Sequence, residues 1–231
     1  MTAASQPVIA ILAVPETSAS VLYGMYDLFR SAGRDWNMAI GGDAGPGVVQ
    51  PVVVATREGS FPVVNDVHVT PETTIARIGC PDVVVIPDLA VDPGGPFDLD
   101  RFATEIAWLK DCHARGAVLA SACSGALLFA EAGLLDGYDA TTHWAFADAI
   151  ARRHPRIRMR PENALVVTGE GHRLVMAGGG TSWSDLALYL ISRFAGVGQA
   201  MDTARMNLVE WHAVGQQPYA RLARSRQSED A

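Results

Sequence analysis

The sequence has little of what marks a secreted or a membrane-spanning protein. It holds three cysteines, Cys80, Cys112 and Cys123, and so sparse and odd a set does not form a disulfide framework. The first residues, MTAASQPVIAILAVP, lack the positive region of a signal peptide. No apolar run approaches the roughly 20 residues of a membrane span. We therefore expect a soluble, cytoplasmic protein with no membrane partner.

Basic charge is also scarce. The net charge is −7 and the sequence pI is about 5.3, whereas a nucleic-acid-binding surface is basic. We expect this chain alone to bind no nucleic acid. Hydrophobic residues make up 49% of the chain, which favours a packed core over disorder. The length fits one α/β domain over residues 1–231, with a frayed polar tail over 221–231.

Metal and cofactor motifs are missing. The histidines and cysteines form no pair or set with metal-ligand spacing, so we expect no metal site. The glycine-rich run AGGGTSW, residues 177–183, is neither a phosphate-binding loop nor a dinucleotide fingerprint, and we expect no cofactor. We interpret this run as a close backbone approach or as a helix start at Thr181.

Short apolar, β-branched runs alternate with longer amphipathic segments. The predicted strands cover residues 8–14, 48–55, 82–87 and 117–122. Continuous apolar strands of this kind suit a parallel sheet that is buried on both faces. The alternation therefore predicts an α/β fold with a doubly wound, mostly parallel sheet flanked by helices.

Glycines and apolar spacing place the remaining elements. The predicted helices cover residues 20–33, 98–116, 181–196 and 198–213, and the first two end at a glycine. Two short apolar runs within residues 164–179 flank Thr168-Gly169-Glu170-Gly171, which predicts a late β-hairpin.

Cys123 lies between a predicted strand and a predicted helix, and Ser124 and Gly125 follow it. Such small neighbours permit the sharp turn of a nucleophile elbow. Free N–H groups at a helix start favour a thiolate, lower its pKa and hold a developing oxyanion. A small buried core residue explains the local pattern equally well.

His143 follows Cys123 by twenty residues, in the segment DATTHWAF, and is the candidate base for the thiol. A single histidine is also explained as an ordinary core or surface residue. Ligand crevices of such sheets lie at the carboxyl ends of the strands, where Cys123, Asp88 and Ser20 are expected. Cys80 and Cys112 are interpreted as packing residues.

Three segments together resemble the ThiJ/PfpI superfamily: ASACSGALLFAEAGLLDGYDATTHW, DVVVIP and MAGGGTSWSDLALYLI. The resemblance covers almost the whole chain in the right order. It implies a class I glutamine amidotransferase-like, flavodoxin-like fold and a homodimer. It also makes Cys123 the elbow cysteine with His143 and Ser124 beside it, where a small-molecule ligand or substrate binds. The N–H groups of Leu89 and Ser124 would form an oxyanion hole.

Two branches of this superfamily are relevant. One contains enzymes such as isonitrile hydratase and glyoxalase-like or deglycase-like proteins. The other forms the N-terminal, effector-sensing domain of AraC-type transcriptional regulators. The segments SWSDLALYLISRF and EWHAVGQQPYARL look more like the regulator branch. No helix-turn-helix region follows up to Ala231, which fits either a stand-alone relative or a truncated sensor domain.

Two positions depart from the enzymatic pattern. Many enzymes carry an acid in the first loop, and counting from the first strand puts Ser20 at that position. The loop after the third strand is usually Gly-Gly, but here it is Asp88-Leu89. These side chains crowd the pocket, and a carboxylate near Cys123 raises its pKa.

These departures favour a ligand- or redox-sensing domain. The alternative is a cysteine-dependent enzyme of the isonitrile hydratase or glyoxalase/deglycase type. In that enzyme Cys123 attacks the substrate and His143 or Ser124 relays a proton. An interaction module with an inert pocket is a third hypothesis.

Overall fold

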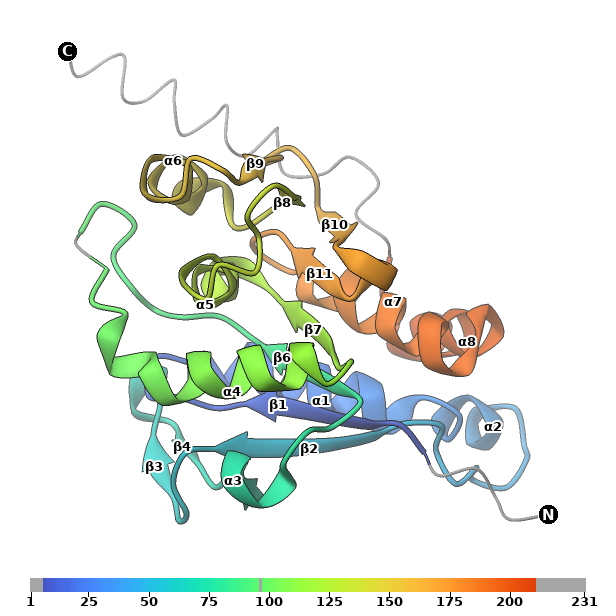
Figure 1. Ribbon diagram of the computed structural model, residues 1–231. Coiled ribbons are helices and arrows are strands. Elements are labelled where there is room, and N and C mark those ends of the chain that lie inside the picture. The colour runs from blue at the N-terminus through green and yellow to red at the C-terminus, as the bar shows by residue number, and fades with distance from the viewer. Residues whose placement is uncertain (1–5, 96, 211–231) are drawn as a thin grey trace.

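A seven-stranded sheet between two layers of helices organises residues 6–95 and 97–210, which the computed structural model describes (Figure 1). Its strands are β1 (Val8–Leu12), β2 (Gln50–Ala55), β5 (Thr73–Thr74), β6 (Val83–Ile86), β7 (Val118–Ser121), β10 (Leu165–Thr168) and β11 (Leu174–Ala177). Their spatial order is β10-β11-β7-β6-β1-β2-β5. Neighbouring strands are parallel except for β10 and β11, which form the predicted antiparallel hairpin.

Two further strand pairs lie outside this sheet. β3 (Phe61–Pro62) pairs with β4 (His68–Val69), and β8 (Asp139–Ala140) pairs with β9 (Arg158–Met159). The helices are α1 (Ala19–Ser31), α2 (Asp35–Ala39), α3 (Ile75–Ile78), α4 (Ala103–Ala114), α5 (Ala126–Glu131), α6 (Trp144–Arg153), α7 (Trp183–Ala195) and α8 (Val197–Asn207).

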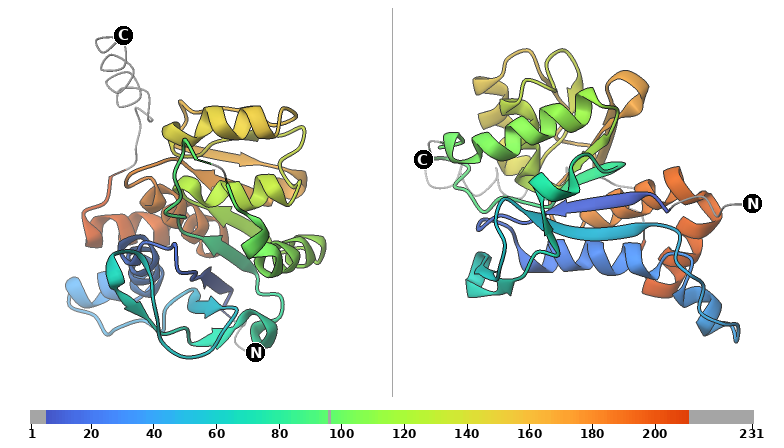
Figure 2. Two further views of the ribbon diagram at one scale, coloured as in Figure 1. Left: turned by 90° about the vertical axis from the view of Figure 1, so that its left-hand side faces the viewer. Right: turned by 60° about the horizontal axis from the view of Figure 1, so that its bottom comes forward.

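Helices cover both faces of the sheet, which explains why its strands are apolar throughout. α4, α5 and α6 lie on one face, whereas α1, α7 and α8 lie on the other (Figures 1 and 2). Along β1, Ile9 and Ile11 pack toward α1 and α7, and Ala10 and Leu12 pack toward α4 and α5. Successive side chains of a strand point to opposite faces, so both sets are buried. The predicted doubly wound α/β fold is confirmed.

Element boundaries differ modestly from the sequence prediction. A 3-10 turn over Asp100–Phe102 precedes α4, so the regular helix begins later than residue 98. α7 begins at Trp183 rather than at Thr181. The last helix is shorter than predicted: α8 ends at Asn207, because Leu208 takes a left-handed conformation, whereas the sequence predicts a helix to residue 213. The predicted frayed tail, residues 221–231, lies outside the described residues. Among the helices that are described, none has both the length and the apolar character that a membrane crossing requires.

Candidate functional site

A sharp turn places Cys123 at the carboxyl end of β7. Ala122 is extended, and Cys123 itself has a φ of +53°, a left-handed conformation that few side chains adopt. A 3-10 turn over Cys123–Gly125 then leads into α5. A Cβ atom at Gly125 would lie only 2.9 Å from the Ile86 carbonyl oxygen, so the turn requires glycine there. The structure therefore forms the elbow that the small residues predict.

The main chain of Cys123 ties three segments together. Its N–H donates to the carbonyl oxygen of Gly178, after β11, at 2.9 Å. Its carbonyl oxygen accepts from Thr142 Oγ1 at 2.7 Å and from the His143 N–H at 3.4 Å. Cys123 and His143 thus lie beside each other, as the sequence predicts, and their backbones are directly linked.

Ser124 fixes the neighbouring loop rather than facing a ligand. Its Oγ donates to the Leu89 carbonyl oxygen at 2.7 Å and accepts from the Leu89 N–H at 2.8 Å. Both residues are buried, each with 1% of its surface exposed. The resemblance implies that the Leu89 N–H is one of two donors in an oxyanion hole. In the structure this N–H instead donates to Ser124 Oγ.

Asp88 is held by Ser18, not by Ser20. The Ser18 N–H donates to Asp88 Oδ1 at 2.9 Å, and Ser18 Oγ donates to Oδ2 at 2.5 Å. Ser20 is exposed in the first turn of α1. The position expected by counting from the first strand, Ser20, therefore faces solvent, and Ser18, two residues earlier, contacts Asp88 instead.

The pKa of the Cys123 thiol lies above that of a free cysteine. Burial is the main cause that raises the pKa of Cys123, and the nearby Asp88 carboxylate raises it further. Hydrogen bonds from the Ser124 N–H and side chain oppose both effects but do not outweigh them. The pKa lowering expected from a helix start is therefore wrong in its net direction, because desolvation dominates.

His143 caps α6 through Nδ1, so its neutral ring presents an N–H group, rather than a lone pair, at Nε2. Its Nδ1 accepts from the Ala145 N–H at 3.1 Å, so the neutral ring carries its proton on Nε2. Burial lowers the pKa of His143, which favours this neutral form near neutral pH. The ring packs on Gly179, where a Cβ atom would lie 2.0 Å from His143 Cδ2. This geometry differs from the predicted role of His143 as a base.

Aromatic rings surround His143. Its ring lies 5.1 Å from Trp144 and 6.2 Å, edge-on, from Phe146. Phe97, from the loop after β6, stacks on Phe146 at 6.2 Å between ring centroids. The loop that carries Asp88 and Leu89 therefore reaches across to α6, and apolar rings border the polar contacts of Cys123.

The sequence does not identify three residues that hydrogen-bond to Cys123 or Asp88: Ser18, Thr142 and Gly178. Thr142 directly precedes His143 in ATTHW, so its proximity was readable from that motif. The AGGG run holds Gly178 and Gly179, and the predicted close backbone approach there is confirmed. Nothing in the sequence pattern distinguishes Ser18 from Ser20. In the part of the chain that the structure describes, no three His, Cys, Asp or Glu residues cluster as metal ligands.

The sequence of this chain matches the DJ-1/PfpI family over residues 23–192. The chain belongs to the DJ-1/PfpI family. It is 33% identical to an isonitrile hydratase of Pseudomonas putida over 136 residues, which cover 59% of this chain and 54% of the hydratase. It is 36% identical over 91 residues to the HTH-type transcriptional regulator CdhR of Pseudomonas aeruginosa.

The regulator alignments are partial. The CdhR match covers 39% of this chain and 26% of the regulator. A second match, to the HTH-type transcriptional regulator GbdR of Pseudomonas aeruginosa, is 28% identical over 131 residues, or 56% of this chain and 33% of the regulator. The DJ-1/PfpI chain therefore spans about a quarter to a third of the length of these relatives.

Solved structures support the fold. Drosophila melanogaster DJ-1beta superposes with a TM-score of 0.73 at 17% identity, covering 90% of this chain and all of that chain. An AraC family transcriptional regulator from Pseudomonas putida superposes with a TM-score of 0.66 at 19% identity, covering 87% of this chain and 99% of the solved one. At such identities the likeness concerns the DJ-1/PfpI fold alone.

Proposed function

We propose that this DJ-1/PfpI chain is a ligand-sensing domain like the effector-binding part of AraC-type regulators. One observation carries the proposal: Ser124 occupies the Leu89 N–H at 2.8 Å. Acyl-transfer and related chemistry need preorganised donors aimed at the developing oxyanion. With one of the two expected donors used internally, the pocket is better suited to binding than to turnover.

The titrating groups agree with this proposal. Burial and Asp88 raise the pKa of Cys123, so little of the reactive thiolate is present near neutral pH. His143 accepts from the Ala145 N–H through Nδ1, so that lone pair is not available to deprotonate the thiol. The same low thiolate content argues against peroxide sensing at Cys123, because oxidation follows thiolate character.

The charge of the pocket sets its ligand class. The Asp88 carboxylate near the thiol disfavours anions and favours neutral or cationic compounds. We propose a small amide, amine or carbonyl compound bound over Cys123. The two HTH-type regulators among the relatives support a sensing role, with DNA binding left to another part of the protein.

Binding is tested by thermal-shift and calorimetric screens of small metabolites. An amine ligand should raise the thermal stability of the chain. Asp88→Asn should weaken amine binding about tenfold or more, because a charged hydrogen-bond partner is lost. Asp43→Asn, at an exposed acid, is the matched control and should change nothing. If no amide, amine or carbonyl compound binds, the sensing proposal fails.

An enzyme is the second candidate, favoured by the strained elbow with a φ of +53° at Cys123 and by the hydratase relative. In this case the Cys123 thiolate adds to an isonitrile carbon or an aldehyde, and water releases the product. Turnover of isonitriles or methylglyoxal above that of Cys123→Ala would establish it. Equal rates in the two proteins dispose of these activities.

We also propose a homodimer and a cytoplasmic location. The dimer rests on the family resemblance rather than on a described interface, and the location rests on the sparse cysteines. Light scattering after size exclusion should give about twice 24.6 kDa. A mass near 24.6 kDa would contradict the dimer.

A further inference from the structure

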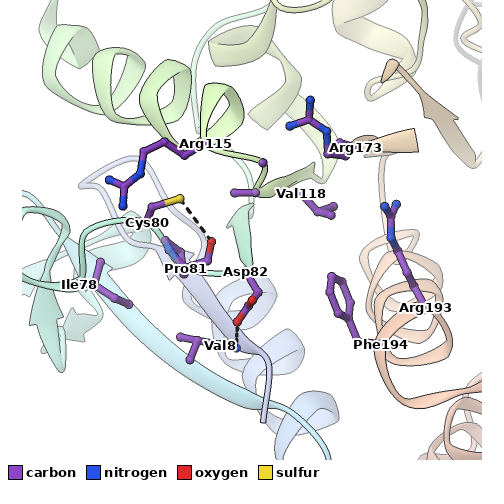
Figure 3. A pocket seen from close by; sticks show the side chains of 12 residues that line it. Val8, Ile78, Cys80, Pro81, Asp82, Arg115, Val118, Arg173, Arg193 and Phe194 are labelled. Carbon is purple, nitrogen blue, oxygen red and sulfur yellow. Dashed lines mark hydrogen bonds between the residues drawn. The ribbon is translucent and has the colours of Figure 1, made fainter. Parts of the chain in front are cut away.

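The amino end of the sheet, opposite Cys123, carries an open cleft of about 580 Å³ (Figure 3). Cys80 and Asp82 line it before and at the start of β6, and Arg115 lines it after α4. Arg173, before β11, and Arg193, near the end of α7, line its other side. A thiol and three guanidinium groups from four segments thus border one space.

Cys80 has a second thiol beside it. Cys80 Sγ lies 3.7 Å from the Cys112 carbonyl oxygen, and Cys112 Sγ lies 3.7 Å from the Gly79 carbonyl oxygen. Each thiol therefore contacts the main chain at or next to the other cysteine; after burial, the neighbouring Cys80 thiol helps to raise the pKa of Cys112 to about 12. Cys80 is half-buried at the cleft wall, whereas Cys112 is fully buried behind it.

The cleft carries more positive than negative charge. Arg173 donates to the His113 carbonyl oxygen, and Arg193 donates to the carbonyl oxygens of Gly171 and His172. Among the ion pairs of the described residues, neither of these arginines has a carboxylate partner.

Little acidic charge offsets these arginines. Asp82, the only acid in the lining of this cleft, accepts from the Val8 N–H. Arg115 pairs with Asp111 at an exposed helix end. Since guanidinium groups favour carboxylates and phosphates, the cleft suits a small anion.

We propose that this cleft binds an anionic, low-molecular-weight disulfide, and that Cys80 and Cys112 exchange with it to form an internal disulfide bond. The site is separate from the Cys123 pocket and does not depend on the function proposed for it. A cleft that only held an anion would not need a thiol pair in its wall, and a packing pair would not need an arginine-lined opening.

The reaction balances in two exchange steps. Cys80 loses its proton to water and attacks one sulfur of the bound disulfide; the S–S bond breaks, a mixed disulfide forms, and the leaving thiolate takes up a proton as the first small thiol. Cys112, after losing its proton to water, attacks the Cys80 sulfur and releases the second small thiol. The protein is oxidised by two electrons, and the small disulfide is reduced to two thiols. The raised pKa of Cys112 slows the second step, but the step is intramolecular between two neighbouring residues, which offsets this.

Glutathione disulfide, which carries carboxylates, is the probe for the reaction. The full chain and its Cys123→Ser variant should both lose two hydrogens by intact mass and yield a Cys80–Cys112 linked peptide. Cys112→Ala should stop at the mixed disulfide on Cys80, and Cys80→Ser should leave Cys112 free. Cys80→Ser alters only a half-buried side chain, so this comparison holds even if Cys112→Ala folds poorly. Recovery of Cys80 and Cys112 as free thiols, or modification of Cys123 alone, overturns the proposal.

Charge selection is tested with the neutral probe hydroxyethyl disulfide. Arg115→Gln should slow the reaction with glutathione disulfide by about two- to fivefold, the range for one exposed charge, and leave the neutral probe unaffected. Arg205→Gln is the matched control, since Arg205 also pairs with an acid on its own helix and is 59% exposed, against 58% for Arg115. Equal slowing by both variants, or equal slowing of both probes, contradicts an anion-selective cleft.

Discussion

The two ends of the sheet bury thiols in different surroundings. At the carboxyl end, Cys123 is fixed through its main chain by Gly178, Thr142 and His143. At the amino end, Cys80 and Cys112 contact each other beside an arginine-lined cleft. Burial is the main cause of a raised pKa at both Cys123 and Cys112. Burial is therefore common to both ends, and the residues around each thiol distinguish them. They make Cys123 part of a binding surface and Cys80 and Cys112 an exchange pair.

Buried polar groups differ in how fully they are hydrogen-bonded. Ser124 and Leu89 satisfy each other through two hydrogen bonds at the carboxyl end. Ser121 Oγ, on the preceding strand, and His113 Nε2, at the amino end, have no hydrogen-bond partner among the described residues. The Ser124–Leu89 pair therefore fixes the elbow against the loop after β6, as a preorganised binding site requires, whereas the Ser121 hydroxyl below it contributes no described hydrogen bond.

The largest expected effect comes from Ser124→Ala. The change leaves the buried Leu89 N–H unpaired, at a cost of about 1–3 kcal/mol, while the Leu89 carbonyl oxygen keeps its hydrogen bond from the Val91 N–H. Ser121→Ala is the matched control, because Ser121 is equally buried but its hydroxyl has no described partner. Urea unfolding should show a large loss for the first variant and little or none for the second. Similar losses in both would contradict the special role of the Ser124–Leu89 pair.

Gly179→Ala should have the next largest effect. Its Cβ atom would meet the His143 ring at 2.0 Å, and overpacking of this kind costs about 1–3 kcal/mol. Gly198→Ala, on α8, meets no atom within 4 Å and should gain about 0.5–1 kcal/mol through helix propensity. Thermal unfolding of the two variants measures this difference. Equal stability would mean that His143 is not packed on the glycine run.

A smaller effect concerns acid sensitivity at the two ends. Burial lowers the pKa of His143 at the carboxyl end and of His113 at the amino end, where Arg173 lowers it further. A lowered folded-state pKa gives stability that is present above the unfolded value of 6.5 and lost as pH falls below it. Unfolding free energies measured between about pH 7 and 5 should therefore decline in the wild type.

Two variants separate these contributions. His143→Asn keeps an acceptor for the Ala145 N–H but does not titrate, so the decline should be shallower. His143→Ala should lose about 1 kcal/mol of capping energy even above pH 7. His113→Asn should reduce the decline independently. An unchanged slope in both asparagine variants would refute burial as the cause.

The sequence predicted the sheet better than the site. Continuous apolar runs identify strands because burial on both faces leaves no room for polar residues, and the small residues around Cys123 identify the elbow because only they fit the turn. The engagement of the Leu89 N–H and the capping role of His143 could not be predicted. The Leu89–Ser124 bond is set by packing between segments that are distant in the sequence. The His143–Ala145 bond is local, but histidine is not among the residues that usually cap a helix.

The pH dependence of Cys123 alkylation tests the central claim most directly, since that claim requires Cys123 to be a half-buried, neutral thiol. Peptide-resolved iodoacetamide labelling should give a midpoint above 9.0, the ordinary value, because burial and Asp88 both raise the pKa. Asp88→Asn should move that midpoint to lower pH, while Asp43→Asn should not. A wild-type midpoint below 9.0, toward neutral pH, would show an activated nucleophile and contradict the account.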